Sequence, residues 1–415
     1  MILPSTDSGA ILCLIISLLC LGSWANLLKA GTGRPPKQQG TRPGSAAPGS
    51  VVPASSSIAG TGPGRPPKQQ GTRPESAAPG SVVPASSSIA SGKWRYELFY
   101  LDFSLGAGVV AVLAALTLGS LNSKELTFQD NLLIAGYRKV AYAATAGAVA
   151  NAANLLLAGA ISVLPLSVAY LIAGGVGLAV STIWMLFPPQ GSVALLVAGG
   201  LAVLSAVAFT ALTYTGYARS LASTTKPSIP NPRPPSWRTR RTARTTSGPG
   251  IALSLISGLA LGMAPPLLTL SRTGEDGLAP YSAGLFFGLA VLGSTALFAP
   301  FFFTFPVRGE PVSVAQYLTG SKTQHLSGLL AGALWIGGSI AALTTSGTLS
   351  AFQVQGQLSA ALADAVPVLG ALWGLLAWRE FRGGGRALPL MAAALALWIA
   401  GASMVVIAAG FGSGK

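Results

Sequence analysis

Polar side chains are rare inside the long apolar stretches of this sequence, and those few are the residues that could bind a ligand. In chain order they are Trp24, Asn26, Asn151, Asn154, Ser167, Tyr170, Trp335, Ser339, Asp364, Trp373 and Trp378. Amide, hydroxyl and carboxyl groups are costly inside a bilayer, so they usually face a neighbouring helix or a water-filled cavity. These side chains could form hydrogen bonds to a polar ligand or carry a proton.

Two of these residues form a pair of amides on one helix face. Asn151 and Asn154 are three residues apart, and residues at this spacing are neighbours on the surface of a helix. One reading is that the amides hold an adjacent membrane helix, which is a common use of Asn in bilayers. The other reading is that they bind a hydroxylated ligand, and the sequence leaves both readings open.

Asp364 is expected to be the only acid well inside an apolar span. It precedes Pro367 by three residues, and a proline removes a backbone hydrogen bond and weakens the helix around it. Asp364 could bind substrate hydroxyls, carry a coupling proton or cap a broken helix. The pair Pro265–Pro266 and Pro300 are expected to interrupt their own helices as well.

Three tryptophans complete the candidate binding residues. Trp24 lies near the end of a span, where Trp commonly anchors a helix at the membrane interface, whereas Trp335 and Trp373 lie in mid-span. An aromatic face beside amide and carboxyl groups suits a sugar-like molecule. Because no Lys or Arg lies inside any span, a neutral polar solute is expected rather than an anionic one.

Enzymatic chemistry finds no support in the sequence. His325 is the only histidine and lies at a membrane boundary, and no set of nucleophile, base and orienting residue can be assembled around it. No GxxxxGK[ST] motif is present. Cys13 and Cys20 are about 10.5 Å apart along a helix, beyond the reach of a disulfide. We expect no enzyme activity, no cofactor and no metal site.

The candidate residues must be positioned by membrane helices. Only 9% of the 415 residues are charged and 51% are hydrophobic, and about 20 apolar residues suffice for a helix to cross a bilayer. Ten such spans are expected, at Gly9–Leu28, Tyr100–Leu121, Val140–Ser162, Pro165–Phe187, Ser192–Tyr217, Gly250–Leu270, Tyr281–Phe305, Leu326–Thr345, Leu358–Trp378 and Leu388–Phe411.

The distribution of basic residues predicts how these spans are oriented. The five odd-numbered loops between spans hold 21 of the 26 Lys and Arg, and cytoplasmic loops are enriched in both residues. The odd loops are therefore expected in the cytoplasm and both termini outside. The net charge of +15 is explained by this bias, and no nucleic-acid partner is expected.

The chain divides into two sets of five spans and two long loops. Residues 1–30 form the first helix, 93–218 form helices two to five, and 250–415 form helices six to ten. Residues 31–92 are a Pro, Gly and Ser-rich loop in which Gly33–Ala59 recurs as Gly64–Ala90, and we expect it to be disordered. Residues 219–249 are a basic, Pro-rich linker expected in the cytoplasm.

Five spans in each half give the halves opposite orientations, which is the inverted-repeat plan of many carriers. A short sequence similarity supports this plan: AGAVANAANLLLAGAIS from Ala146 and AGALWIGGSIAALTTSG from Ala331 both open the third helix of a half. The expected fold is therefore an all-α polytopic membrane protein with a 5+5 inverted repeat.

Three segments resemble one known family of carriers. They are LGSWANLLK from Leu21, ANAANLLLAGAISVLPLSVAYLIAGGVGLAV from Ala150 and ALWGLLAWREFRG from Ala371. The chain resembles the glucose/ribose porter and ureide permease branch of the drug/metabolite transporter superfamily over all ten spans but neither long loop. The resemblance implies transport of sugars or ureides by alternating access. The positions that it carries over are Trp24, Asn26, Asn151, Asn154, Trp373 and Glu380.

These observations together predict a transporter of a small neutral polar solute, with a sugar ahead of a ureide, nucleobase or drug. A proton or a sodium ion is the candidate coupling ion, with Asp364 as the candidate proton carrier. The expected location is the bacterial cytoplasmic (inner) membrane. The sequence does not decide whether the chain forms a homodimer. A non-transporting membrane scaffold is the competing class, in which the amides and Asp364 merely lock helices together.

Overall fold

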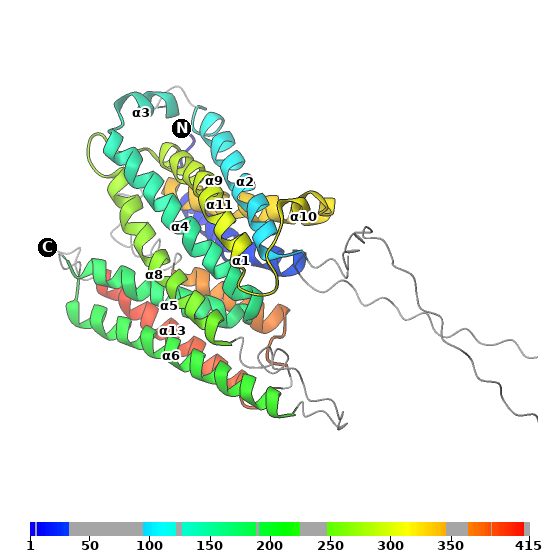
Figure 1. Cartoon of the computed structure of the whole chain (residues 1–415). Helices are drawn as coiled ribbons and strands as arrows, with labels where there is room; N and C mark the ends of the chain where they lie inside the picture. Colours follow the sequence, from blue (N-terminus) through cyan, green and yellow to red (C-terminus); the bar gives the residue numbers. More distant parts are fainter. Residues whose placement is uncertain are drawn as a thin grey trace, which may run out of the picture. The chain divides into compact units, whose positions relative to one another are not determined.

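The computed structural model describes residues 1–4, 6–32, 94–121, 127–187, 191–224, 247–345, 364–382 and 384–410. Every regular element in these residues is a helix (Figure 1). The helices are α1 (Asp7–Gly31), α2 (Tyr96–Leu116), α3 (Phe128–Ile134), α4 (Tyr137–Val163), α5 (Leu166–Met185), α6 (Val193–Thr224), α8 (Ser247–Arg272), α9 (Pro280–Thr304), α10 (Val314–Leu318), α11 (Lys322–Thr345) and α13 (Ala387–Gly410).

Nine helices of the described residues are long and apolar enough to cross a bilayer. They coincide with nine of the ten predicted spans, so the chain is an all-α polytopic membrane protein. The ninth predicted span corresponds to a shorter apolar helix, Asp364–Ala377, which we call the short helix. At 1.5 Å per residue it is about 21 Å long, and residues 358–363 of the predicted span lie outside the described residues.

Some helices continue beyond the segments predicted for them. Helix α6 continues to Thr224 and α8 begins at Ser247, so both helices extend into the predicted central linker. The prolines at 265, 266 and 300 do not end their helices but lie inside α8 and α9, because neighbouring helices can satisfy the freed backbone groups. The predicted disordered loop at 31–92 lies outside the described residues from residue 33 onward, as do residues 225–246 of the linker.

Each long helix packs against one or more partners that are distant in the sequence. Helix α4 packs against α8 and α9, and α11 packs against α1 and α2. Helix α6 packs against α13, α2 against α9, and α5 against α8 and α6. In Figure 1, α6 and α13 run side by side, next to α5.

Glycines at the helix crossings let the backbones approach closely, which is the usual packing mode in membranes. A Cβ at Gly199 of α6 would lie 2.8 Å from the Val405 side chain of α13, and a Cβ at Gly401 of α13 would lie 2.8 Å from the Val203 side chain of α6. Each glycine therefore faces a valine of the other helix.

Two further pairs of close contacts share this reciprocal form. Gly174 of α5 contacts Pro367 of the short helix, and Gly370 of the short helix contacts Tyr170 of α5. Likewise Gly147 of α4 contacts the Phe287 carbonyl oxygen of α9, and Gly332 of α11 contacts the Phe103 carbonyl oxygen of α2. A Cβ at any of these four glycines would lie within 2.5 Å of an atom of the paired helix, so a larger residue would force that atom to move.

One end of the helix bundle holds the odd-numbered loops, and we call it the odd-loop end. There the last turn of α1 meets the first turns of α2 and α11: a Cβ at Gly31 would lie 2.7 Å from Ser327 Oγ and 3.7 Å from the Phe99 ring. The start of α8 meets the end of α4 at the same end, through Gly250 and Leu164. The even-numbered loops lie at the opposite end because the helices alternate in direction.

Candidate functional site

Trp24 and Trp335 belong to an aromatic core in the interior of the bundle. The Phe103 ring lies 5.0 Å from Trp24, 5.7 Å from Trp335 and 4.8 Å from Tyr100, measured between ring centroids. Trp335 also stacks on Phe287 at 5.5 Å. Trp24 is only 2% exposed, so it is a core residue and not an interfacial anchor. Offset and tilted ring pairs of this kind stabilise packing beyond the area they bury.

Asn151 lies beside this core and connects three helices. Its Oδ1 accepts a hydrogen bond from the Tyr100 hydroxyl of α2 at 3.0 Å. Its Nδ2 donates to Ser294 Oγ at 2.8 Å and Thr295 Oγ1 at 2.9 Å, both on α9. The amide is fully buried and its hydrogen-bonding capacity is used by protein groups. The structure therefore favours the helix-holding reading for Asn151.

Asn154 and Tyr170 have a different environment. Both are almost fully buried, yet within the described residues the Asn154 Nδ2 and the Tyr170 hydroxyl lack a hydrogen-bond partner. A buried polar group without a partner costs about 1–3 kcal/mol, so such groups are candidates to meet a ligand or water. Of the two amides, Asn154 is the one free to bind a solute. Ser339 donates to the Trp335 carbonyl one turn earlier in α11, at 2.9 Å.

Glu380 caps the N-terminus of α5 at the odd-loop end. Its carboxylate accepts hydrogen bonds from the Leu166 N–H at 2.5 Å and the Ser167 N–H at 2.9 Å, and from Ser167 Oγ at 2.7 Å. The Lys29 ammonium at the end of α1 forms an ion pair with the same carboxylate. A negative charge at this position is stabilised by the unpaired N–H groups and the dipole of α5.

Aromatic side chains next to Glu380 extend these contacts along α1. Trp378 Nε1 donates to Asn26 Oδ1 at 2.8 Å, and Lys29 Nζ lies 4.9 Å from the centroid of the Trp378 ring. Trp373 Nε1 donates to Ser23 Oγ at 3.1 Å. We call Asn26, Lys29, Ser167, Trp378 and Glu380 the Glu380 latch. It joins α1 and α5 to the short helix, so Asn26 and Ser167 bind other side chains in this structure.

The backbone that delivers Glu380 to α5 is irregular. The last turn of the short helix is a π-helix, Trp373–Ala377, and Arg379 adopts a left-handed conformation with φ 50°. A non-glycine residue in this region costs about 1–2 kcal/mol, which the hydrogen bonds of Glu380 can offset. Gly374 is needed inside the turn, because a Cβ there would lie 2.6 Å from the Ser167 backbone nitrogen.

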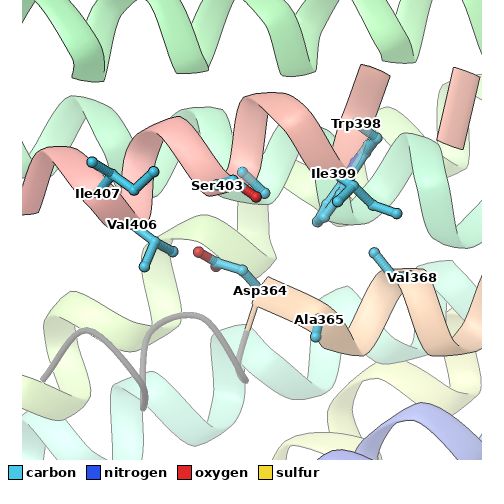
Figure 2. A pocket seen from close by; sticks show the side chains of 9 residues that line it. Asp364, Ala365, Val368, Trp398, Ile399, Ser403, Val406 and Ile407 are labelled. Carbon is cyan, nitrogen blue, oxygen red and sulfur yellow. The ribbon is translucent and has the colours of Figure 1, made fainter. Parts of the chain in front are cut away.

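Asp364 lies at the other end of the short helix, in a groove of about 410 Å³ between this helix and α13. Figure 2 shows the Asp364 carboxylate and the Ser403 hydroxyl directed into the same space. Val368, Ile399, Val406 and Ile407 provide apolar walls. In the part of the chain that is described, no side chain donates a hydrogen bond to Asp364. We call this feature the Asp364 groove.

Six of the predicted residues thus fall into three separate places. Trp24, Asn151 and Trp335 meet around the aromatic core, Asn26 and Trp378 meet in the Glu380 latch, and Asp364 lines its groove. Tyr170 packs between α5 and the short helix, against Gly370.

Asp364 is not the only acid well inside a span, and that prediction was wrong. Asp102 lies in the second turn of α2 and is 2% exposed, and Glu97 one turn earlier is equally buried. Asp102 binds His325, whose Nδ1 lies 2.9 Å from Asp102 Oδ2, and this pair was not among the predicted site residues. The signal for this pair was an acid and the single His of the sequence at two predicted helix starts on the same side of the membrane.

Metal and disulfide chemistry find no site in the described residues: no group of three metal-ligating side chains occurs, and Cys13 and Cys20 are free thiols. No family model, no curated protein and no solved structure matches the chain. The function must therefore be inferred from the aromatic core, the Glu380 latch and the Asp364 groove.

Proposed function

We propose that this chain is a secondary active or facilitative transporter, with ten spans arranged as a 5+5 inverted repeat, that moves a small neutral polar solute by alternating access. The observation that carries this proposal is the set of reciprocal glycine contacts between helices of the two halves. These contacts are independent of the sequence resemblance to sugar and ureide carriers.

If a two-fold axis relates the two halves, every contact between two helices recurs between the two corresponding helices of the other half. If each span of the first half is matched with the span five positions later, α4 corresponds to α11, α8 to α1, and α9 to α2. The packing of α4 on α8 then becomes that of α11 on α1, and the packing of α4 on α9 becomes that of α11 on α2, and all four occur. Gly147 and Gly332, which contact Phe287 and Phe103, occupy the same place in the similar segments from Ala146 and Ala331.

The reciprocal pairs Gly199–Val405 and Gly401–Val203 fit the same axis, since the fifth and tenth spans correspond to each other. Because each half has an odd number of spans, the axis lies in the membrane plane. Inverted repeats of this kind rock against one another around a central site in many carriers.

The Glu380 latch and the Asp364 groove would then be the closed and open ends of one transport path. The latch ties the first half, through α1 and α5, to the short helix of the second half. The groove begins about 20 Å away along that helix. We assign this structure to a state closed at the odd-loop end, which the positive-inside rule places in the cytoplasm.

The side chains of the groove favour an uncharged solute. Among the residues that the structure describes, its lining combines one carboxyl and one hydroxyl group with apolar side chains and contains no Lys or Arg. A sugar is the first candidate because its hydroxyls can bind Asp364 and Ser403 while its C–H groups pack on the apolar walls. A ureide or nucleobase is second and an amphipathic drug third.

The experiment that tests the function is uptake by reconstituted protein. Liposomes containing the full chain are offered radiolabelled neutral sugars, ureides, nucleobases and a sugar phosphate, and empty liposomes serve as the control. We expect saturable uptake of at least one neutral solute and none of the phosphate. Exclusive uptake of the phosphate, or no uptake by folded protein, would contradict the proposal.

The competing function is a non-transporting scaffold, and Asn151 is the observation that favours it, because its amide serves only to hold helices. A scaffold predicts that variants of Asn154 and Asp364 change nothing except stability. A carrier predicts that they change solute affinity while the protein stays folded.

A further inference from the structure

Asp102, Tyr317 and His325 form a compact cluster at the odd-loop end that the transport path described above does not use. The Tyr317 hydroxyl of α10 donates to Asp102 Oδ1 at 2.5 Å, and His325 Nδ1 of α11 lies 2.9 Å from Asp102 Oδ2. Both carboxylate oxygens of an acid on α2 are therefore bound by two other elements. We call these three residues the Asp102 cluster.

Aromatic packing holds the cluster in place. The Trp94 ring meets His325 edge-on at 5.0 Å and lies 6.2 Å from Tyr317, and the Tyr317 and His325 rings are 4.7 Å apart. Gly328 of α11 allows the close approach, since a Cβ there would lie 2.5 Å from Asp102 Cβ. Tyr317 thereby docks α10 onto α2 and α11.

The two titratable partners differ in their access to water. The Asp102 side chain is 2% exposed, whereas the His325 side chain is 25% exposed. A proton from the odd-loop side can therefore reach His325 directly and Asp102 only through it. An imidazole ordinarily changes its charge between about pH 5 and 8.

Other charged groups nearby are occupied or face water. On α2, Glu97 is paired with Arg95 at 2.6 Å, and Arg95 also donates to the carbonyl oxygens of Arg308 and Glu310 in the α9–α10 loop. On α11, Lys322 is exposed. No Lys or Arg of the described segments forms an ion pair with Asp102.

Tyr317 is the titratable group that α10 contributes. Burial, and then the hydrogen bond to the Asp102 carboxylate, raise the pKa of Tyr317 to about 12. The phenol therefore stays a neutral donor at physiological pH, and only the pair Asp102 and His325 can change its charge there.

The net charge of this pair decides how well it tolerates burial. With Asp102 ionised and His325 neutral, the pair carries a charge of −1 under α10. Uptake of one proton from water brings the net charge to zero, and no other bond forms or breaks. Burying a net charge in a low-dielectric site is much more costly than burying a neutral or internally paired group. Protonation should therefore favour the docked position of α10, and loss of the proton should favour its release.

We propose that Asp102 and His325 form the proton-binding site of this protein, with Tyr317 coupling its occupancy to the docking of α10. Assuming the proposed transport function, this site takes up the coupling proton in place of Asp364. The pair offers a second proton-binding group and a route to water, whereas Asp364 has no such partner among the described residues.

The chain contains one histidine, so the site has a residue-specific probe. NMR of full-length protein carrying 13C,15N-labelled histidine, in lipid nanodiscs, reports the protonation of His325 without any solute. We expect the imidazole to gain a proton as the pH is lowered and to respond differently to pH in Asp102→Asn, because the imidazolium loses its anionic partner. An imidazole that never gains a proton, or an identical pH response in Asp102→Asn, would overturn the proton site.

A transport measurement tests the coupling separately. In liposomes with an imposed pH gradient, Asp102→Asn should lose at least tenfold of the gradient-driven accumulation and keep solute exchange, and Tyr317→Phe should shift the pH profile of uptake. Asp364→Asn should keep its dependence on the gradient. Equal gradient dependence of Asp102→Asn and wild type would overturn the coupling role. Because the NMR titration needs no solute, failure of the proposed function and failure of the proton site remain distinguishable.

Discussion

Two carboxylates stand at opposite ends of one short helix, and their surroundings are opposite as well. Glu380, after the end of the helix, is bound by two backbone N–H groups, a hydroxyl and an ammonium. Asp364, at its start, faces an apolar groove and receives no side-chain hydrogen bond within the described residues. The two acids are about 20 Å apart along the helix axis.

This difference separates a structural acid from one that is available to a ligand. All oxygens of Glu380 have partners, so its substitution should act on stability and on the closure of the odd-loop end. Asp364 has unused hydrogen-bonding capacity, so its substitution should act on solute affinity. The same contrast holds for Asn151 and Asn154 on α4.

The largest expected effect is that of Glu380→Ala. The change leaves Lys29 without its partner and two N–H groups of α5 uncapped, and loss of one partner of a buried ion pair typically costs about 3 kcal/mol. Thermal unfolding in detergent should show this loss. The matched control is Glu275→Ala, an exposed acid, which should change little. Equal stability of the two variants would remove the structural role of the latch.

The next largest effect compares the two amides of α4. Asn151→Ala removes the amide that binds Tyr100, Ser294 and Thr295, whose hydroxyls keep only their backbone carbonyl partners, and should lower the free energy of unfolding by about 1–3 kcal/mol. Asn154→Ala removes an amide nitrogen that has no partner among the described residues, so it should lower the free energy of unfolding less and impair uptake more. The reverse order in thermal unfolding would show that the contrast between the amides is mistaken.

Asp364→Asn should change stability by less than about 0.5 kcal/mol, because no hydrogen bond of the described residues is lost. We expect the KM for uptake to rise about tenfold, the usual cost of losing a hydrogen bond to a charged group. The comparison is sharpened by Asp7→Asn, which changes an acid in the first turn of α1 and should leave KM unaltered. An unchanged KM in Asp364→Asn would separate the groove from the transport path.

The smallest effect is expected from deleting residues 64–90, one copy of the repeated segment. The segment is rich in Pro, Gly and Ser and has no apolar period, so it should contribute little to the packed helices. Folded yield and uptake should stay close to those of the full chain. Loss of uptake by a well-inserted deletion protein would assign the repeat a function.

The spans could be predicted from the sequence because a bilayer imposes a length and a composition on each helix. The sequence could not predict the continuation of α8 through Pro265 and Pro266, since contacts with other helices decide whether a proline ends a helix. The π-turn before Trp378 was unpredictable for a similar reason: it depends on the hydrogen bonds that Glu380 makes to α5, far away in the chain.

The candidate residues were found by their polarity, but their roles could not be predicted. Asn151 and Asn154 have the same side chain on the same helix face, and only the neighbouring helices distinguish them. Asp102 was missed as a second acid because it lies near the start of its span, where acids commonly reach water. Its burial results from the docking of Tyr317 and His325, which are over 200 residues away.

The central claim is that solute passes through the Asp364 groove, and a pair of adjacent substitutions tests it most directly. Ser403 and Met404 are both exposed neighbours on α13, but only Ser403 lines the groove. Uptake of the solute identified by the liposome assay should fall at least tenfold in Ser403→Phe, whose ring fills the groove, and stay near wild type in Met404→Phe, with equal thermal stability of the two variants. Full uptake by a folded Ser403→Phe protein would contradict the account.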